Sequence, residues 1–161
     1  MRVAIITLSD SGYAGQREDK SGPVIRELAE AAGYEIVHTV LLPDGIEPLA
    51  SELRRLCDED MADLVLTTGG TGFSPTDLPP EATLSVVERP APGIAEAMRY
   101  NSLQITPRAM LSRAAAGIRK RTLIVNLPGS PKAVRECLEF ILPSLGHGLE
   151  ILRGTAGECA R

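Results

Sequence analysis

The sequence predicts an α/β fold built on a parallel sheet. Short apolar runs rich in β-branched residues, at 3–8, 64–66 and 122–127, indicate strands that are covered on both faces. Between the first strands lie stretches whose apolar residues recur at helical spacing. A β-α-β-α-β order of this kind is typical of parallel strands joined by right-handed helical crossovers.

Strands and helices alternate regularly in the first half of the chain. The polar, glycine-rich segment 9–22 leads into a helix that begins near Pro23 and is ended by Gly33. The strand at 34–42 carries more polar residues, which favours a place near an edge of the sheet. After a turn at 43–45, an apolar stripe predicts an amphipathic helix that carries Cys57 in the core.

The second half of the chain contains one segment whose structure the sequence leaves open. Residues 110–118 fit a helix, because alanines permit one, or a hairpin, because only residues 119–121 separate them from the next strand. Residues 89–93, with two prolines and a glycine, end the helix before them. The elements predicted here are helices at 79–88 and 94–103, a strand at 122–127 and a final helix that carries residues 134–145.

The length and composition favour one domain of modest size. With 161 residues the chain can bury one core, so we expect a single domain at 1–154 and a frayed tail at 155–161. Seventeen Lys and Arg against twenty-one Asp and Glu give a net charge of −4, and there are only three Tyr and two Phe. This composition argues against a nucleic-acid-binding protein, which needs a basic face and often stacking aromatics.

The cysteines and the hydropathy favour a soluble protein of the reducing cytoplasm. Cys57, Cys137 and Cys159 are far apart and form no C-x-x-C motif, so neither a disulfide framework nor a structural zinc site is expected. Residues 3–8 are too few for the apolar part of a signal peptide, and no segment approaches twenty apolar residues. We expect no membrane partner.

The stretch from Asp63 to Asp77, DLVLTTGGTGFSPTD, is the best candidate for a ligand site. It joins a buried strand to a glycine loop at the strand end where open α/β sheets bind ligands, and Thr67, Thr68, Thr71 and Ser74 offer hydroxyls there. Glycine amides and hydroxyls suit phosphate, although a tight strand-to-helix turn explains the glycines equally well. The loop lacks the third glycine of G-x-G-x-x-G, and GQREDKS at 15–21 has Asp19 where a Walker A loop needs glycine.

Several loops are expected to meet at one edge of the sheet, because the carboxyl ends of parallel strands share an edge. They carry Asp10, Asp44 and Asp77, and a fourth loop contributes Pro128 and Gly129. Each aspartate alone is typical of a turn or a helix cap. Carboxylates about 4 Å apart repel by about 4 kcal/mol at an effective dielectric near 20, which Mg²⁺ would relieve. The pattern therefore indicates magnesium-dependent nucleotide chemistry.

Long motifs in the chain resemble the molybdopterin adenylyltransferases of molybdenum-cofactor biosynthesis, including the G domains of plant and animal fusion proteins. The match runs from Val3 to about Leu152 and includes SDSGYAGQREDKSGP, LPDG, LTTGGTGFSPTDLPPEAT and MLSRAAAGIRKRTLIVNLPGSPKAV. The resemblance implies a three-layer sandwich whose mostly parallel sheet has one antiparallel strand, supplied by a hairpin before residue 127. It also implies transfer of an adenylyl group from Mg-ATP to the terminal phosphate of molybdopterin.

The resemblance also assigns roles to individual residues. Asp44 and Asp77 would be the catalytic and magnesium-binding aspartates, and Ser112 would serve the molybdopterin side. The nucleotide and phosphate loop would comprise Gly69, Gly70, Thr71 and Gly72. The family implies a homotrimer and a downstream molybdenum-insertion protein. Pro79 departs from the family pattern, since it stands where members commonly have a threonine.

Two other functions fit the same residues. A sibling of the same superfamily could bind a pterin without adenylylating it, although the presence of both Asp44 and Asp77 favours an active enzyme. A scaffold or interaction module is the second alternative. A chain of 161 residues without appended domains argues against it.

Overall fold

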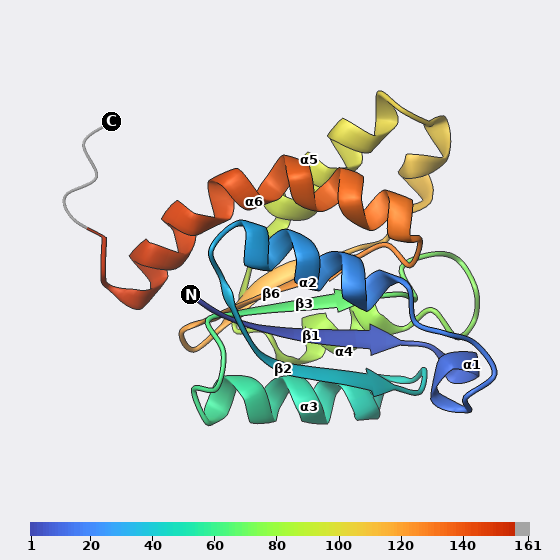
Figure 1. Ribbon diagram of the computed structural model, residues 1–161, viewed down its shortest axis with the longest axis horizontal. Helices are drawn as coiled ribbons and strands as arrows, with labels where there is room; N and C mark the ends of the chain where they lie inside the picture. The colour runs from blue at the N-terminus through green and yellow to red at the C-terminus, as the bar shows by residue number, and fades with distance from the viewer. Residues whose placement is uncertain (157–161) are drawn as a thin grey trace.

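A six-stranded sheet with helices on both faces makes up the computed structural model, which describes residues 1–156 (Figure 1). The strand order is β2-β1-β3-β6-β5-β4. The strands are β1 (Arg2–Leu8), β2 (Glu35–Leu42), β3 (Leu64–Thr68), β4 (Arg89–Pro90), β5 (Ala116–Arg119) and β6 (Thr122–Leu127). The helices are α1 (Asp10–Tyr13), α2 (Ser21–Ala31), α3 (Ile46–Asp58), α4 (Pro79–Val86), α5 (Pro92–Leu103), the 3₁₀ helix η1 (Pro107–Leu111) and α6 (Pro131–Arg153).

The predicted mixed sheet is confirmed. Strands β2, β1, β3 and β6 run parallel, and β5 is antiparallel to both β6 and β4. The segment that the sequence left open therefore forms η1 and then the first strand of a hairpin, as the family resemblance implied. β2 lies at an edge of the sheet, in agreement with its more polar sequence.

The sheet separates two apolar cores, which gives the three layers that were expected (Figure 1). Along β1, Val3 and Ile5 face the core beneath α2, α5 and α6, whereas Ala4 and Ile6 face the core beneath α3 and α4. Every residue of β3 and β6 is buried, which explains why both strands read as continuous apolar runs. Cys57 lies in the α3 core as predicted, and burial raises the pKa of its thiol to about 11.

The short elements β4 and α1 were not predicted, the first because it is defined by tertiary hydrogen bonds. Residues 89–90 were expected only to end a helix, but they pair with β5, and the neighbouring Glu88 N–H donates to Ile118 O at 2.8 Å. The preceding helix therefore ends at Val86 rather than at Glu88. The four residues of α1 lie in a segment expected to be a loop, where the Ser9 hydroxyl accepts from the Gly12 N–H at 3.0 Å.

At the edge of the sheet where the parallel strands begin, a charged cluster ties the last helix to the first and third strands. Arg153 of α6 contacts the carboxylates of Asp60 and Asp63 at 2.6 and 3.2 Å. Arg2 donates to Asp63 through both its backbone N–H and its guanidinium. Beyond α6, the Thr155 and Ala156 amides still donate to Glu150 O, whereas residues 157–161 of the expected tail, with Cys159, lie outside the described residues.

No helix within residues 1–156 has the length and apolar character needed to cross a membrane.

Candidate active site

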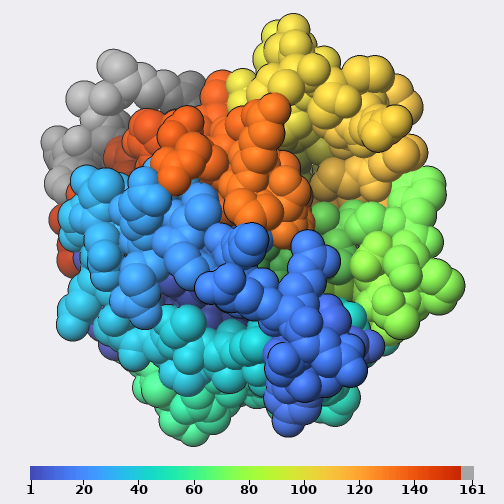
Figure 2. All heavy atoms as spheres, turned by 45° about the vertical axis from the view of Figure 1, so that its right-hand side comes forward, coloured from blue at the N-terminus to red at the C-terminus, as the bar shows by residue number. Residues whose placement is uncertain are grey.

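The loops that follow the four parallel strands meet at one rim of the sheet. The Ser9 N–H after β1 donates to Leu42 O of β2 at 3.1 Å, and the Thr68 hydroxyl of β3 donates to Pro128 O after β6 at 2.7 Å. The Ser21 hydroxyl at the start of α2 donates to Gly129 O at 2.7 Å. Figure 2 looks onto this side of the molecule, where the blue segment after β1, the green loop after β3 and the orange start of α6 border one another.

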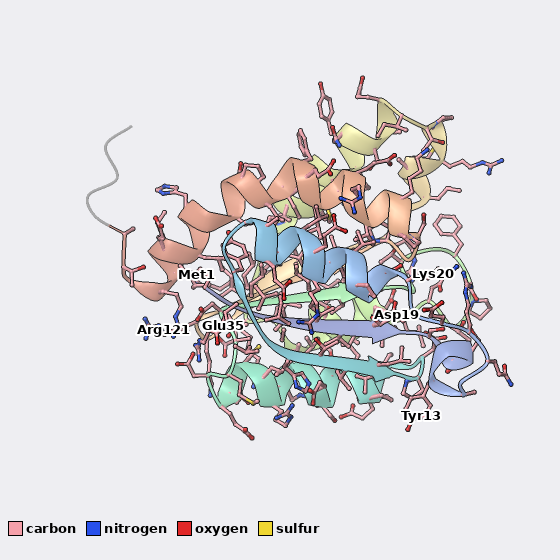
Figure 3. All side chains as sticks on the ribbon, in the orientation of Figure 1. Met1, Tyr13, Asp19, Lys20, Glu35 and Arg121 are labelled. Atoms are coloured by element: carbon pink, nitrogen blue, oxygen red, sulfur yellow. The ribbon has the colours of Figure 1, made fainter. Side chains whose placement is uncertain are left out.

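A cavity of about 760 Å³ opens at the rim between β1, the start of α2 and the start of α6. Its size lies within the usual range for small-molecule sites. Gly69 and Gly129 line it, as does the charged run after α1 that holds the cations Arg17 and Lys20 and the carboxylates Glu18 and Asp19. In Figure 3, Lys20 and Asp19 lie beyond the carboxyl end of β1, opposite Met1, Glu35 and Arg121.

The three aspartates predicted for the site lie near one another at this rim, although none of them lines the cavity. Asp10 and Asp44 exchange hydrogen bonds, since Asp44 N–H donates to Asp10 Oδ1 at 2.9 Å and Asp10 N–H donates to Asp44 Oδ2 at 3.3 Å. Partial burial raises the pKa of the Asp44 carboxyl, and the negative charges of Asp10 and Asp77 raise it further. The hydrogen bond from the Asp10 N–H lowers this pKa, but it does not cancel the increase. Asp77 is therefore close enough for its charge to act on Asp44.

The glycine loop after β3 adopts a backbone that side chains would prevent. Gly69 has φ +100°, and a Cβ there would lie 2.5 Å from Leu8 O of β1. Gly70 has φ +65°, and its Cβ would lie 2.6 Å from Cδ of Pro79. Packing alone therefore requires these two glycines, and their small size also leaves the backbone of the loop open to an anion.

Asp77 closes the far end of the same loop. Its Oδ2 accepts the Ser74 N–H at 2.9 Å and would lie 2.9 Å from a Cβ on Gly72. The side chains at the tip of the loop are exposed, with Phe73 at 70% of its surface. Thr71 is buried, and its carbonyl accepts the Arg113 N–H at 2.8 Å.

Ser112 and Pro128 lie apart from the larger cavity. They line a second cavity of about 220 Å³, which is bounded by α5, η1 and the first turns of α6. The carbonyl of Ser112 accepts from Arg99 Nη1 of α5 at 3.3 Å. Of the residues predicted for the site, Gly69 and Gly129 thus line the larger cavity and Ser112 and Pro128 the smaller one, whereas the three aspartates line neither.

Sequence reasoning missed some of the residues at the rim. Arg17 and Lys20 were not singled out, although the failed Walker A comparison covered both. Asp19, the residue that does not fit a Walker A loop, binds the first amides of α2. Its carboxylate accepts from the Ser21 and Gly22 amides at 3.0 Å and from the Thr7 hydroxyl at 2.7 Å.

The rim fits a magnesium ion only together with a phosphate-bearing ligand. Among residues 1–156 there is no group of three or more His, Cys, Asp or Glu side chains arranged to hold a metal. Burial is the main cause of the raised pKa of Asp44, and the negative charges of Asp10 and Asp77 add to it, so negative charge gathers at this carboxylate. Mg²⁺ is usually bound by one or two carboxylates and by substrate phosphates, which matches this donor set.

Comparison with known proteins agrees with this architecture. A family model described as a probable molybdopterin binding domain matches residues 4–147. The molybdopterin adenylyltransferase of Helicobacter pylori strain J99 is 39% identical over 156 residues, which cover 96% of this chain and 89% of the relative. That of Escherichia coli K12 is 41% identical over 150 residues, covering 91% and 76%.

A solved structure shares the fold. The molybdopterin biosynthesis enzyme MoaB of Thermus thermophilus superposes with a TM-score of 0.90 at 47% identity, covering 95% of this chain and 96% of that one. The resemblance drawn from the motifs is confirmed, and the chain belongs to the molybdopterin-binding domain family that includes these adenylyltransferases.

Proposed function

We propose that this protein is a molybdopterin adenylyltransferase. The observation that carries the proposal is the proximity of Asp10, Asp44 and Asp77 at the same rim of the sheet as a cavity lined by Gly69, Gly129 and the charged run 17–20. The names of relatives about 40% identical over nearly the whole chain support the same reaction.

In this reaction, an oxygen of the terminal phosphate of molybdopterin attacks the α-phosphorus of ATP. A new P–O bond forms, the bond from the α-phosphorus to the bridging oxygen breaks, and pyrophosphate leaves with that oxygen. A phosphate monoester is largely ionised at neutral pH, so the attacking oxygen needs no strong general base. This agrees with the position of the histidines, since His38 lies in mid-strand on β2 and His147 near the far end of α6.

Catalysis would then depend on positioning and on compensation of charge. Asp44 and Asp77, with Asp10 beside them, would hold Mg²⁺ together with the phosphates of ATP. The bound ion would supply positive charge against the phosphoryl oxygens. The amides of Gly69, Gly70, Thr71 and Gly72 and the side chains of Arg17 and Lys20 would hold phosphate oxygens.

Molybdopterin would be bound by Ser112 and Pro128, which line the second cavity, and by Gly129, which lines the first. The turn that contains Pro128 and Gly129 borders both cavities, so it would lie between the two substrates. This division predicts that changes at Ser112 act on molybdopterin and that changes at Asp77 act on the metal and nucleotide.

We also propose that the protein acts as a cytoplasmic homotrimer formed by a single domain at residues 1–154, and that it passes its product to a molybdenum-insertion protein. Exposed apolar side chains on α5, η1, the link between them and α6 support an interface there, namely Tyr100, Leu103, Ile105, Met110, Leu111 and Phe140. Light scattering of the purified protein would give the mass of the assembly, and Phe140→Asp is expected to shift it toward the monomer.

The test of function is a direct assay. Purified protein is mixed with ATP, Mg²⁺ and molybdopterin, and pyrophosphate release is followed. Release that depends on all three components is the expected result. Binding of molybdopterin without release of pyrophosphate would identify the protein as a binding-only sibling, and failure to bind either substrate would contradict membership of the pathway.

A further inference from the structure

An arginine distant in sequence closes the loop that carries Asp77. Arg113 Nε donates to Gly72 O at 2.8 Å, and its Nη2 donates to Asp77 O. These carbonyls stand at the two ends of the segment 72–77, whose middle residues 73–76 are exposed, so one guanidinium spans the base of the loop. The backbone N–H of the same arginine holds Thr71 O at 2.8 Å.

A carboxylate on the next helix fixes the guanidinium in turn. Glu81, in the first turn of α4, forms an ion pair with Arg113 Nη1 and accepts a second contact from Nη2 at 3.4 Å. Hydrogen bonding to Arg113 lowers the pKa of Glu81, and hydrogen bonding to Glu81 raises the pKa of Arg113. The negative charge of Asp77 also raises the pKa of Arg113, so the two side chains lie near each other.

The direction of the Asp77 carboxylate depends on how this loop is closed. Its Oδ2 is held by the Ser74 N–H and lies against Gly72, and both residues belong to the segment that Arg113 spans. The side chains of residues 73–76 are exposed. The guanidinium therefore fixes the two ends of this loop relative to each other.

We propose that Arg113 and Glu81 are positioning residues that hold the Asp77 carboxylate in its productive place. The inference rests on the proposed function, because it concerns the aspartate assigned to magnesium and nucleotide. Neither side chain needs to touch a substrate. A loss of the pair would leave Asp77 present but misplaced, which should weaken its interaction with Mg-ATP.

Lysine at position 113 provides a sharp test. It keeps the positive charge, but a single ammonium cannot reach two carbonyls and a carboxylate in the directions that a planar guanidinium serves. Glu81→Gln is the second variant, because it removes the charge of the anchor while keeping its size. Because the two variants lie on different elements, the proposal can still be tested if one of them fails to fold.

The chain offers a matched control in Arg119. This arginine donates to Asp58 Oδ1 and Oδ2 at 2.9 and 2.8 Å and to Val86 O at 3.0 Å, so it also joins a carboxylate to a carbonyl of α4. It lies at the end of the β5–β6 hairpin, away from the rim. Arg119→Lys therefore removes similar bonds without affecting the loop of Asp77.

The experiment measures kcat, both KM values, the Mg²⁺ concentration for half-maximal activity, and the melting temperature of each variant. Arg113→Lys and Glu81→Gln are expected to lower kcat by about 10- to 100-fold, the usual cost of losing a group that orients a metal ligand. They should raise the Mg²⁺ requirement and leave KM for molybdopterin unchanged. Their melting temperatures should match that of Arg119→Lys, whose kinetics should remain those of the wild type.

Wild-type kcat and Mg²⁺ dependence in Arg113→Lys would overturn the proposal while the proposed function stands. So would a loss of activity that merely follows a loss of melting temperature. If the wild type releases no pyrophosphate, the proposed function fails by itself. In that case the positioning role is tested by calorimetric titration with ATP, with and without Mg²⁺. The magnesium-dependent part of ATP binding must weaken in Arg113→Lys and not in Arg119→Lys. Equal magnesium-dependent binding by the two variants would refute the positioning role.

Discussion

Replacement of Gly69 by alanine tests whether the glycine loop is held by packing. Gly69 has φ +100°, and a Cβ there would lie 2.5 Å from Leu8 O, which belongs to a central strand and cannot move aside easily. Gly33 is a matched control, because its φ is +82° but no atom lies within 4 Å of its Cβ position. The two variants share the backbone penalty and differ in the clash.

The magnitude follows from these two contributions. A left-handed backbone costs an alanine about 1–2 kcal/mol of stability. Alanine also makes the unfolded chain less flexible than glycine does, which recovers about 0.4–1 kcal/mol. Gly33→Ala should therefore lose at most about 1.5 kcal/mol. Overpacking against a rigid neighbour adds about 1–3 kcal/mol, so Gly69→Ala should lose about 2–4 kcal/mol.

The assay is urea unfolding of both variants and the wild type, followed by circular dichroism, with thermal melts in parallel. For a chain of this length each kcal/mol shifts the melting temperature by about 2–4 °C, so Gly69→Ala should melt about 5–15 °C below the wild type. Equal stability of Gly69→Ala and Gly33→Ala would refute the argument, since it would mean that the loop moves away from β1 without cost.

The other predictions concern the site and the charged cluster. Asp44→Asn and Asp77→Asn should each abolish pyrophosphate release while titration still shows molybdopterin binding; wild-type rates in either would remove the assignment of that aspartate. Ser112→Ala should weaken molybdopterin in equilibrium titration and leave ATP unchanged, and the reverse pattern would exchange the two sites. Arg153 and Arg2 lower the pKa of Asp60 to about 2 and, against the effect of burial, Arg2 also lowers the pKa of Asp63. A carboxyl group whose pKa is lowered by folding stabilises the fold fully when the pH is above its ordinary pKa, about 4. This stabilisation is lost as the pH falls toward about 2. Thermal melts across this window should therefore show a smaller loss for Asp63→Asn than for the wild type.

The strands and the meeting of the aspartates could be predicted because they follow from local patterns. Continuous apolar runs identified β1, β3 and β6, and parallel strands place their carboxyl ends at a common edge. That rule was enough to bring Asp10 and Asp44 together, although 34 positions separate them.

The rest depended on contacts that no local pattern records. β4 has two residues and exists only through pairing with β5, so a helix-ending motif gave no sign of it. Arg113 reaches Asp77 across 36 positions, and an arginine before a strand is not distinctive in a sequence. Arg17 and Lys20, the cations that line the cavity, could not be predicted either, because exposed arginines and lysines are common on any protein surface.

The charged cluster around Asp63 has a practical consequence for handling the protein. It brings Arg2 and Arg153, near the two ends of the described chain, together at Asp63, where the parallel strands begin, whereas the cavity lies at the carboxyl ends of these strands. A tether attached before Met1 would extend from the side of the molecule opposite the cavity. Copies immobilised in that way on a sensor surface should keep the substrate entrance facing the solution.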